Sequence, residues 1–108
     1  MSAADIPNEE AISLPSADRR FALAVGCDNA SCVPPNWATL QSAEKDARDV
    51  AYHLEQPTSG FKLFRQAIVG KDATVPNIRQ AMIEFVKGKA EDDLLLFYFS
   101  GHAQPIKN

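Results

Sequence analysis

One histidine stands where a catalytic base could act. His102 follows Ser100 and Gly101 directly after the apolar run Leu94 to Phe99. A run of this length and character predicts a strand, and ligands bind in open parallel sheets just beyond the carboxyl ends of the strands. An imidazole titrates near neutral pH, so it can take a proton from a nucleophile and later return it. His102 is therefore the leading candidate for acid–base chemistry.

The two cysteines and the other histidine are weaker candidates. Cys27 and Cys32 have four residues between them in a predicted loop, and we expect free thiols in a reducing compartment. A zinc site that joins them to His53 and His102 is not favoured, because His53 falls inside a predicted helix without the ligand spacing of a known site. We expect neither a metal nor a cofactor.

Two segments show the apolar periodicity of helices that pack on one face. The stripe of the first helix consists of Leu40, Ala43, Ala47, Val50, Ala51 and Leu54. The stripe of the second helix consists of Ile78, Ala81, Met82, Phe85 and Val86. Thr74 is the expected N-cap of the second helix, with Pro76 in its first turn and Gly88 near its end.

Helices and strands alternate along the chain. We expect a strand at 21–26, a loop at 27–39, a helix over 40–54, a strand at 61–69, a helix from 74 to near 88 and a strand at 94–99. This order predicts a parallel sheet with right-handed crossovers and helices on both faces. The predicted fold class is therefore three-layer α/β, with a partial parallel sheet.

These blocks resemble those of the caspase-like cysteine peptidases, the clan of caspases, metacaspases and their bacterial relatives. LLLFYFSGH, preceded by Asp92 and Asp93, is similar to the histidine motif of the family. Three further blocks agree in order and spacing: 20–26 with the first strand, 46–50 with the first helix, and 73–78 with the entry to the second helix. The polar character of residues 1–19 predicts a leader, and the resemblance predicts that 20–108 are the N-terminal part of a caspase-like domain ending just after the histidine motif.

The resemblance implies that His102 activates a cysteine thiol and then protonates the leaving amine. In the family the nucleophile follows the next strand, and neither Cys27 nor Cys32 stands there. We therefore expect a part of a cysteine endopeptidase domain that is inactive alone and hydrolyses peptide bonds when the rest of the domain completes it. The alternative is a non-catalytic caspase-like module used for interaction or regulation.

Two further residues receive roles from the resemblance. The backbone N–H of Ala103 corresponds to an oxyanion-hole donor, where the family usually has glycine; if that position requires a positive φ, the Cβ of alanine disfavours it. Asp46 matches the metacaspase aspartate that lines the pocket for a basic P1 side chain. The plainer interpretation of Asp46, a carboxylate on a helix surface, stays open.

Composition limits the partners. The 108 residues carry a net charge of −3, which provides no basic field for nucleic acid, and the run 94–99 is far shorter than the roughly 20 residues that cross a membrane. The N-terminus lacks the pattern of a secretory signal, so we expect a cytoplasmic protein. A protein or peptide substrate is expected. An exposed apolar edge at 94–99 predicts association with the remainder of the domain or self-association.

Overall fold

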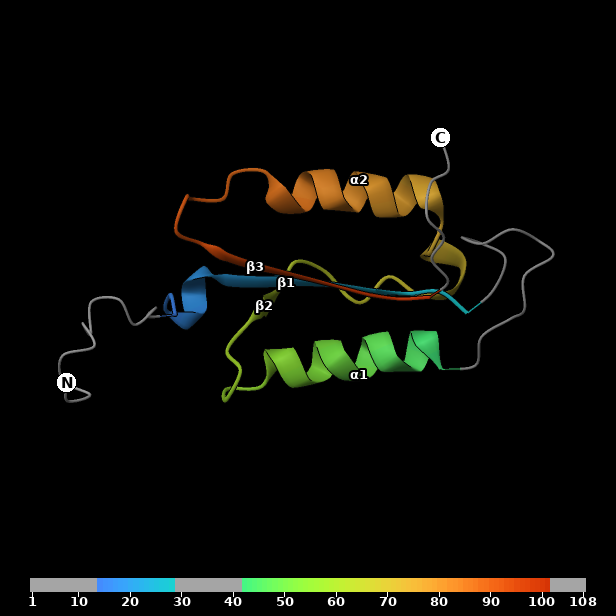
Figure 1. Ribbon diagram of the computed structural model, residues 1–108, viewed down its shortest axis with the longest axis horizontal. Coiled ribbons are helices and arrows are strands. Elements are labelled where there is room, and N and C mark those ends of the chain that lie inside the picture. Colours follow the sequence, from blue (N-terminus) through green and yellow to red (C-terminus); the bar gives the residue numbers. More distant parts are fainter. Residues whose placement is uncertain (1–13, 29–41, 102–108) are drawn as a thin grey trace, which may run out of the picture.

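The computed structural model describes residues 14–28 and 42–101, in which a parallel sheet carries a helix on each face (Figure 1). The elements are β1 (Arg20–Gly26), α1 (Ala43–Glu55), β2 (Lys62–Leu63), α2 (Val75–Val86) and β3 (Leu94–Ser100), with single 3-10 turns at Ala17–Arg19 and Gly70–Asp72. Helix α2 covers one face of the sheet and α1 the other. The structure thus confirms the predicted three-layer α/β class and the predicted order of elements.

Strand β1 is the centre of the sheet, whose order is β2-β1-β3. It pairs in parallel with β3 over seven residue pairs. On one face Leu23 and Val25 belong to a core cluster that includes Phe85 of α2, and on the other face Ala24 packs with Ala47 of α1. A strand covered on both sides must be apolar at successive positions, which is why this run does not alternate.

Helix α1 approaches the sheet closely because its buried side chains are small. Ala43, Ala47 and Ala51 are the buried residues of this helix, and they follow the predicted stripe. At the point of contact, a Cβ added to Gly26 would lie 2.3 Å from the backbone oxygen of Ala43. Only glycine fits at this position, so Gly26 both ends β1 and seats the first turn of α1.

Helix α2 begins as predicted but is less buried than its stripe suggests. The side chain of Thr74 caps the helix by accepting a hydrogen bond from the backbone N–H of Asn77 at 3.2 Å. Phe85 is 3% exposed, whereas Met82 is 41% and Val86 57% exposed. The prediction that these last two are buried is wrong, because α2 rests on the sheet along a narrower stripe and its outer side has no covering layer among the described residues.

The predicted strand at 61–69 is also corrected by the structure. Only Lys62 and Leu63 form β2, and one isolated bridge joins Ile68 to Val25. The N–H of Phe64 donates to the carbonyl oxygen of Ala22, and the N–H of Ile68 donates to that of Ala24. Between these two contacts the segment advances by four residues, whereas β1 advances by two. The extra residues bend away from the sheet between the two contacts, which explains why the apolar pattern in this segment is less regular.

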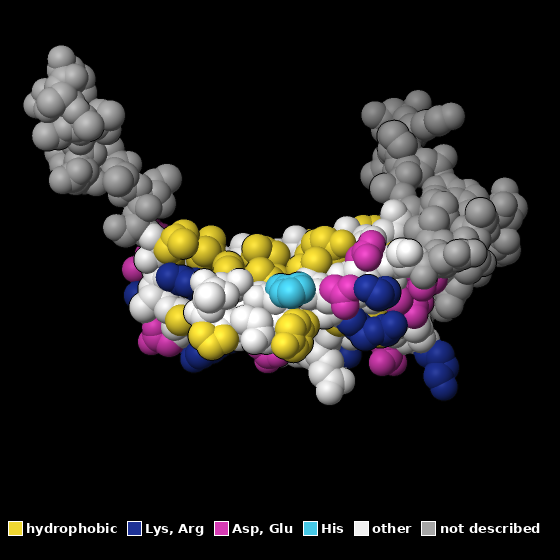
Figure 2. Space-filling model, turned by 90° about the horizontal axis from the view of Figure 1, so that it is seen from below, with side chains coloured by type: hydrophobic (Ala, Val, Ile, Leu, Met, Phe, Trp, Pro, Cys, Tyr) yellow, Lys and Arg dark blue, Asp and Glu magenta, His cyan; other side chains and the backbone are white. Residues whose placement is uncertain are grey.

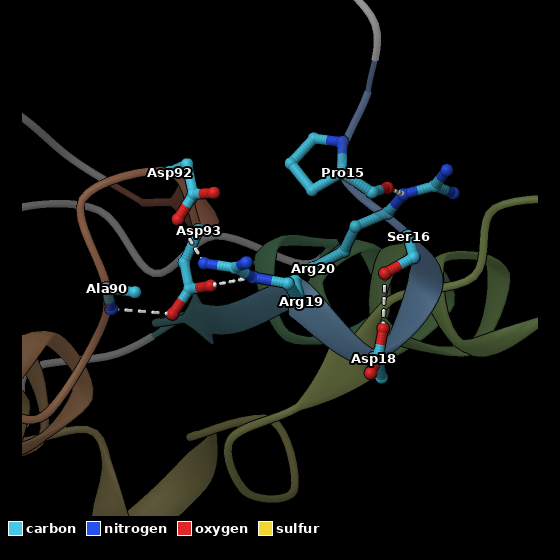
Figure 3. Close-up of polar contacts among 8 residues, drawn as sticks. All are labelled: Pro15, Ser16, Asp18, Arg19, Arg20, Ala90, Asp92 and Asp93. Atoms are coloured by element: carbon cyan, nitrogen blue, oxygen red, sulfur yellow. Dashed lines mark hydrogen bonds and ion pairs between the residues drawn. The ribbon is translucent and has the colours of Figure 1, made fainter.

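A charged cluster ties the starting ends of β1 and β3 together (Figure 3). The Nε of Arg19 donates to Asp93 at 2.7 Å, and a second guanidinium nitrogen pairs with Asp92. The other carboxylate oxygen of Asp93 accepts from the N–H of Ala90 at 2.7 Å. The hydrogen bond from Ala90 and then that from Arg19 lower the pKa of Asp93, because both favour the ionised carboxylate.

Across residues 14–28 and 42–101, no helix has both the length and the apolar character that crossing a membrane requires.

Candidate active site at the carboxyl end of the sheet

The carboxyl ends of β1 and β3 lie against one another. The N–H of Cys27 donates to the carbonyl oxygen of Ser100 at 3.0 Å. A Cβ added to Gly101 would lie 2.9 Å from the ring of Phe99 and 3.4 Å from the carbonyl oxygen of Cys27. Glycine is therefore the residue that fits between the two strand ends. His102 and Ala103 come next in the chain and lie outside the described residues.

Asp46 is placed at the same end of the sheet by the first turn of α1. Its side chain is exposed, and the following residue, Ala47, is buried against the sheet. The N–H of Asp46 donates to the carbonyl oxygen of Ser42 at 2.8 Å, which is the first regular hydrogen bond at the start of this helix. Figure 2 shows charged side chains of both signs gathered on the half of the α1 face that is nearest the strand ends. The carboxylate of Asp46 is therefore accessible to a ligand at this end of the sheet.

Two carboxylates that the sequence analysis did not single out join this end of the sheet. Oδ1 of Asp28 accepts from the backbone N–H of Glu44 at 3.1 Å, and Oε2 of Glu44 accepts from the backbone N–H of Asp28 at 3.3 Å. Both contacts are partly buried. The sequence signal was weak, because the two residues stand 16 apart and belong to no shared periodic pattern.

The weaker candidates lie elsewhere or are unavailable for chemistry. Cys27 is 1% exposed and disulfide-bonded, with its Sγ 3.9 Å from the carbonyl oxygen of Ala73, so the expectation of a free thiol at Cys27 is wrong; Cys32 lies outside the described residues. His53 is exposed in the last turn of α1, at the opposite end of that helix from Asp46. Among the residues the structure describes, no three His, Cys, Asp or Glu side chains gather where they could hold a metal ion.

The outer side of β3 is open within the described residues. There, strand β3 pairs with β1 alone, and Phe97 and Phe99 are each 40% exposed. A groove of about 470 Å³ runs between this strand and α2. It is lined by Val75, Ile78, Arg79, Met82, Ile83 and Phe99. An apolar strand edge beside an apolar groove is a surface that a further element of polypeptide would cover.

Comparison with known proteins identifies the family. The family model described as the caspase domain, of the peptidase C14 group, matches residues 19–108. The chain belongs to the caspase domain family. The match begins at Arg19, directly before β1, and spans all three strands of the sheet and both α-helices. It therefore covers the whole described core as well as the histidine motif. No curated protein and no solved structure matched the chain.

Proposed function

We propose that this chain is the histidine-bearing part of a caspase-like cysteine endopeptidase domain, in which His102 is the general base and acid. The observation that carries the proposal is the position of β3 within a caspase domain: the strand ends against β1 at the carboxyl edge, and the next residue after Gly101 is His102. The described backbone up to Gly101 is fixed against β1 by the hydrogen bond from Cys27 to Ser100, and a catalytic side chain must be held in a defined geometry, which supports the proposed role of the next residue. The N–H of Ala103 is proposed as an oxyanion donor.

The nucleophilic thiol is proposed to come from polypeptide that pairs with the open edge of β3. Cys27 is disulfide-bonded and buried, so it offers no thiolate, and Cys32 belongs to the same sequence stretch after β1. The apolar edge with Phe97 and Phe99 supports an additional strand at this place, because pairing would satisfy backbone groups and bury both rings. Self-association through the same edge is the competing outcome.

Asp46 is proposed to anchor a basic P1 side chain, so that the substrates are proteins or peptides cleaved after Lys or Arg. The exposed side chain of Asp46 on the first turn of α1, at the carboxyl end of the sheet, supports this role. A charge-assisted hydrogen bond of this kind contributes about 1.5–3 kcal/mol, which corresponds to about 10- to 150-fold in rate. A cytoplasmic location remains part of this proposal.

The test compares the 108-residue chain with the product that includes any coding sequence beyond Asn108. Both are assayed with fluorogenic peptides that end in Arg, Lys or Asp, with and without a thiol-alkylating reagent. We expect thiol-dependent cleavage after Arg and Lys from a completed domain, none from the 108-residue chain, and none from His102→Ala. Cysteine-dependent turnover by the shorter chain would contradict the assignment of the nucleophile.

Asp46→Asn has a matched control in Asp49→Asn, an exposed carboxylate one turn further along the same helix that pairs with Lys45. We expect the first variant to lower kcat/KM for Arg peptides by about 10- to 150-fold and the second to leave it near the wild-type value. Equal effects would refute the P1 role of Asp46. A completed domain that binds protein partners but hydrolyses none of the peptides would favour the non-catalytic module.

A further inference from the structure

The first turn of α1 is capped by a residue that is distant in the sequence. Ser42 occupies the N-cap position, but its side chain makes no capping hydrogen bond. The cap is instead supplied by Asp28, whose Oδ1 accepts from the N–H of Glu44. An N–H of the first turn has no partner inside the helix, so a carboxylate that accepts from it stabilises the turn and also complements the positive end of the helix.

Glu44 also accepts a hydrogen bond from Asp28, so the two residues form a reciprocal pair. Its Oε2 accepts from the N–H of Asp28, just beyond the end of β1. Its Oε1 lies 4.0 Å from the place where a Cβ on Gly70 would stand, so the carboxylate reaches toward the turn that precedes α2. The pair therefore connects the end of β1 to α1 through two hydrogen bonds that run in opposite directions.

We infer that Asp28 and Glu44 are positioning residues that hold the first turn of α1, and with it Asp46, in place to receive a basic P1 side chain. The inference rests on the proposed function of Asp46. Asp46 stands two residues after Glu44, and its own N–H bond to Ser42 belongs to the turn that the pair caps. If this turn frays, the carboxylate of Asp46 loses its fixed backbone, and recognition of a guanidinium by charge and geometry weakens.

The experiment uses two alanine variants and two conservative variants of the full gene product. Asp28→Ala and Glu44→Ala remove the acceptor oxygens, whereas Asp28→Asn and Glu44→Gln each keep one. Two quantities are measured by NMR: hydrogen exchange of the Glu44 and Asp46 amides, and the dissociation constant for acetyl-arginine amide, with acetyl-norleucine amide as the uncharged control ligand.

For Asp28→Ala we expect about fivefold faster exchange of the amides of residues 44 and 46, which is the usual effect of a lost cap. Glu44→Ala leaves the cap oxygen in place but removes the acceptor that holds the N–H of Asp28, so we expect faster exchange of the same two amides through a less firmly held Asp28. We also expect the dissociation constant for acetyl-arginine amide to rise about fivefold, with no change for acetyl-norleucine amide. The amide side chains of the two conservative variants retain a carbonyl oxygen, so these variants should stay within about twofold of wild type on both measurements.

The results separate this inference from the proposed function. If Asp46→Asn weakens arginine binding but the alanine variants do not, the positioning role is overturned and the P1 anchor stands. Unchanged amide exchange in the alanine variants would also overturn the positioning role. If Asp46→Asn leaves arginine binding unchanged, the P1 role of Asp46 fails, and the positioning role fails with it even where exchange is faster.

Discussion

Phe85 is the side chain of α2 whose loss should destabilise this protein most. It is 3% exposed and belongs to the core cluster with Leu23, Val25 and Ile68. Its ring also meets that of Phe64, with centroids 5.6 Å apart and planes inclined at 57°. Truncation of a buried phenylalanine to alanine costs about 3–5 kcal/mol, because the transfer free energy is lost and a cavity remains.

The next residue provides the matched control. Val86 is 57% exposed, so Val86→Ala removes little buried surface and should change the free energy of unfolding by less than about 0.5 kcal/mol. Phe85→Ala removes an amount comparable with the whole stability of a small domain, about 5 kcal/mol at the lower end. Phe85→Leu keeps most of the volume, and its expected loss of up to about 1.5 kcal/mol leaves a folded state to measure.

The assay is urea unfolding followed by circular dichroism at several protein concentrations. Wild type and the three variants are compared with one common value for the dependence of the unfolding free energy on urea concentration. We expect the order of stability to be wild type and Val86→Ala first, Phe85→Leu next and Phe85→Ala last. The reasoning would be refuted if Val86→Ala were as destabilising as Phe85→Leu in a protein that remains monomeric. The same result with concentration-dependent unfolding would show that a second copy covers the outer face of α2.

Three further substitutions test other parts of the structure. Gly26→Ala should cost about 1–3 kcal/mol and shift the amide resonances of the first turn of α1, because the new Cβ would stand 2.3 Å from the backbone oxygen of Ala43; unchanged stability and spectra would show that the helix is not seated there. Thr74→Ala should cost about 1 kcal/mol in thermal or urea unfolding, whereas Thr74→Ser should restore the cap; equal losses would contradict a hydroxyl cap. The pKa of Asp93 is lowered in the folded protein, so its contribution to stability is complete above the unfolded-state pKa and is lost as the pH falls through the folded-state pKa. Asp93→Asn should therefore be less stable than wild type at neutral pH and should flatten the loss of stability on acidification, and parallel pH profiles would argue against this role.

Much of the fold could be predicted from local sequence. The order of elements, the approximate ends of both helices and the Thr74 cap followed from periodicity, turn residues and capping preferences, and the structure confirms them. Such signals depend on residues within one or two turns of each other, which a sequence displays directly. The same locality made Gly101 and His102 recognisable as the residues that follow an apolar strand.

Other features depend on contacts between distant segments. Periodicity indicated which side chains of α2 share a face, but only the packed structure showed that Phe85 is covered by the sheet while Val86 has no covering layer within residues 14–28 and 42–101. The break in the predicted strand at 61–69 has the same origin, since it follows from how that segment meets β1.

At the candidate site, the sequence by itself determined the types of residue available and their order: a histidine after β3 and an aspartate on the first turn of α1. The tertiary structure decided that the strand end and Asp46 lie at one end of the sheet, and that Asp28 and Glu44 bind each other across 16 residues. The physical reason is that a parallel sheet gathers the ends of strands far apart in the chain, and hydrogen bonds between such ends leave no periodic trace in sequence.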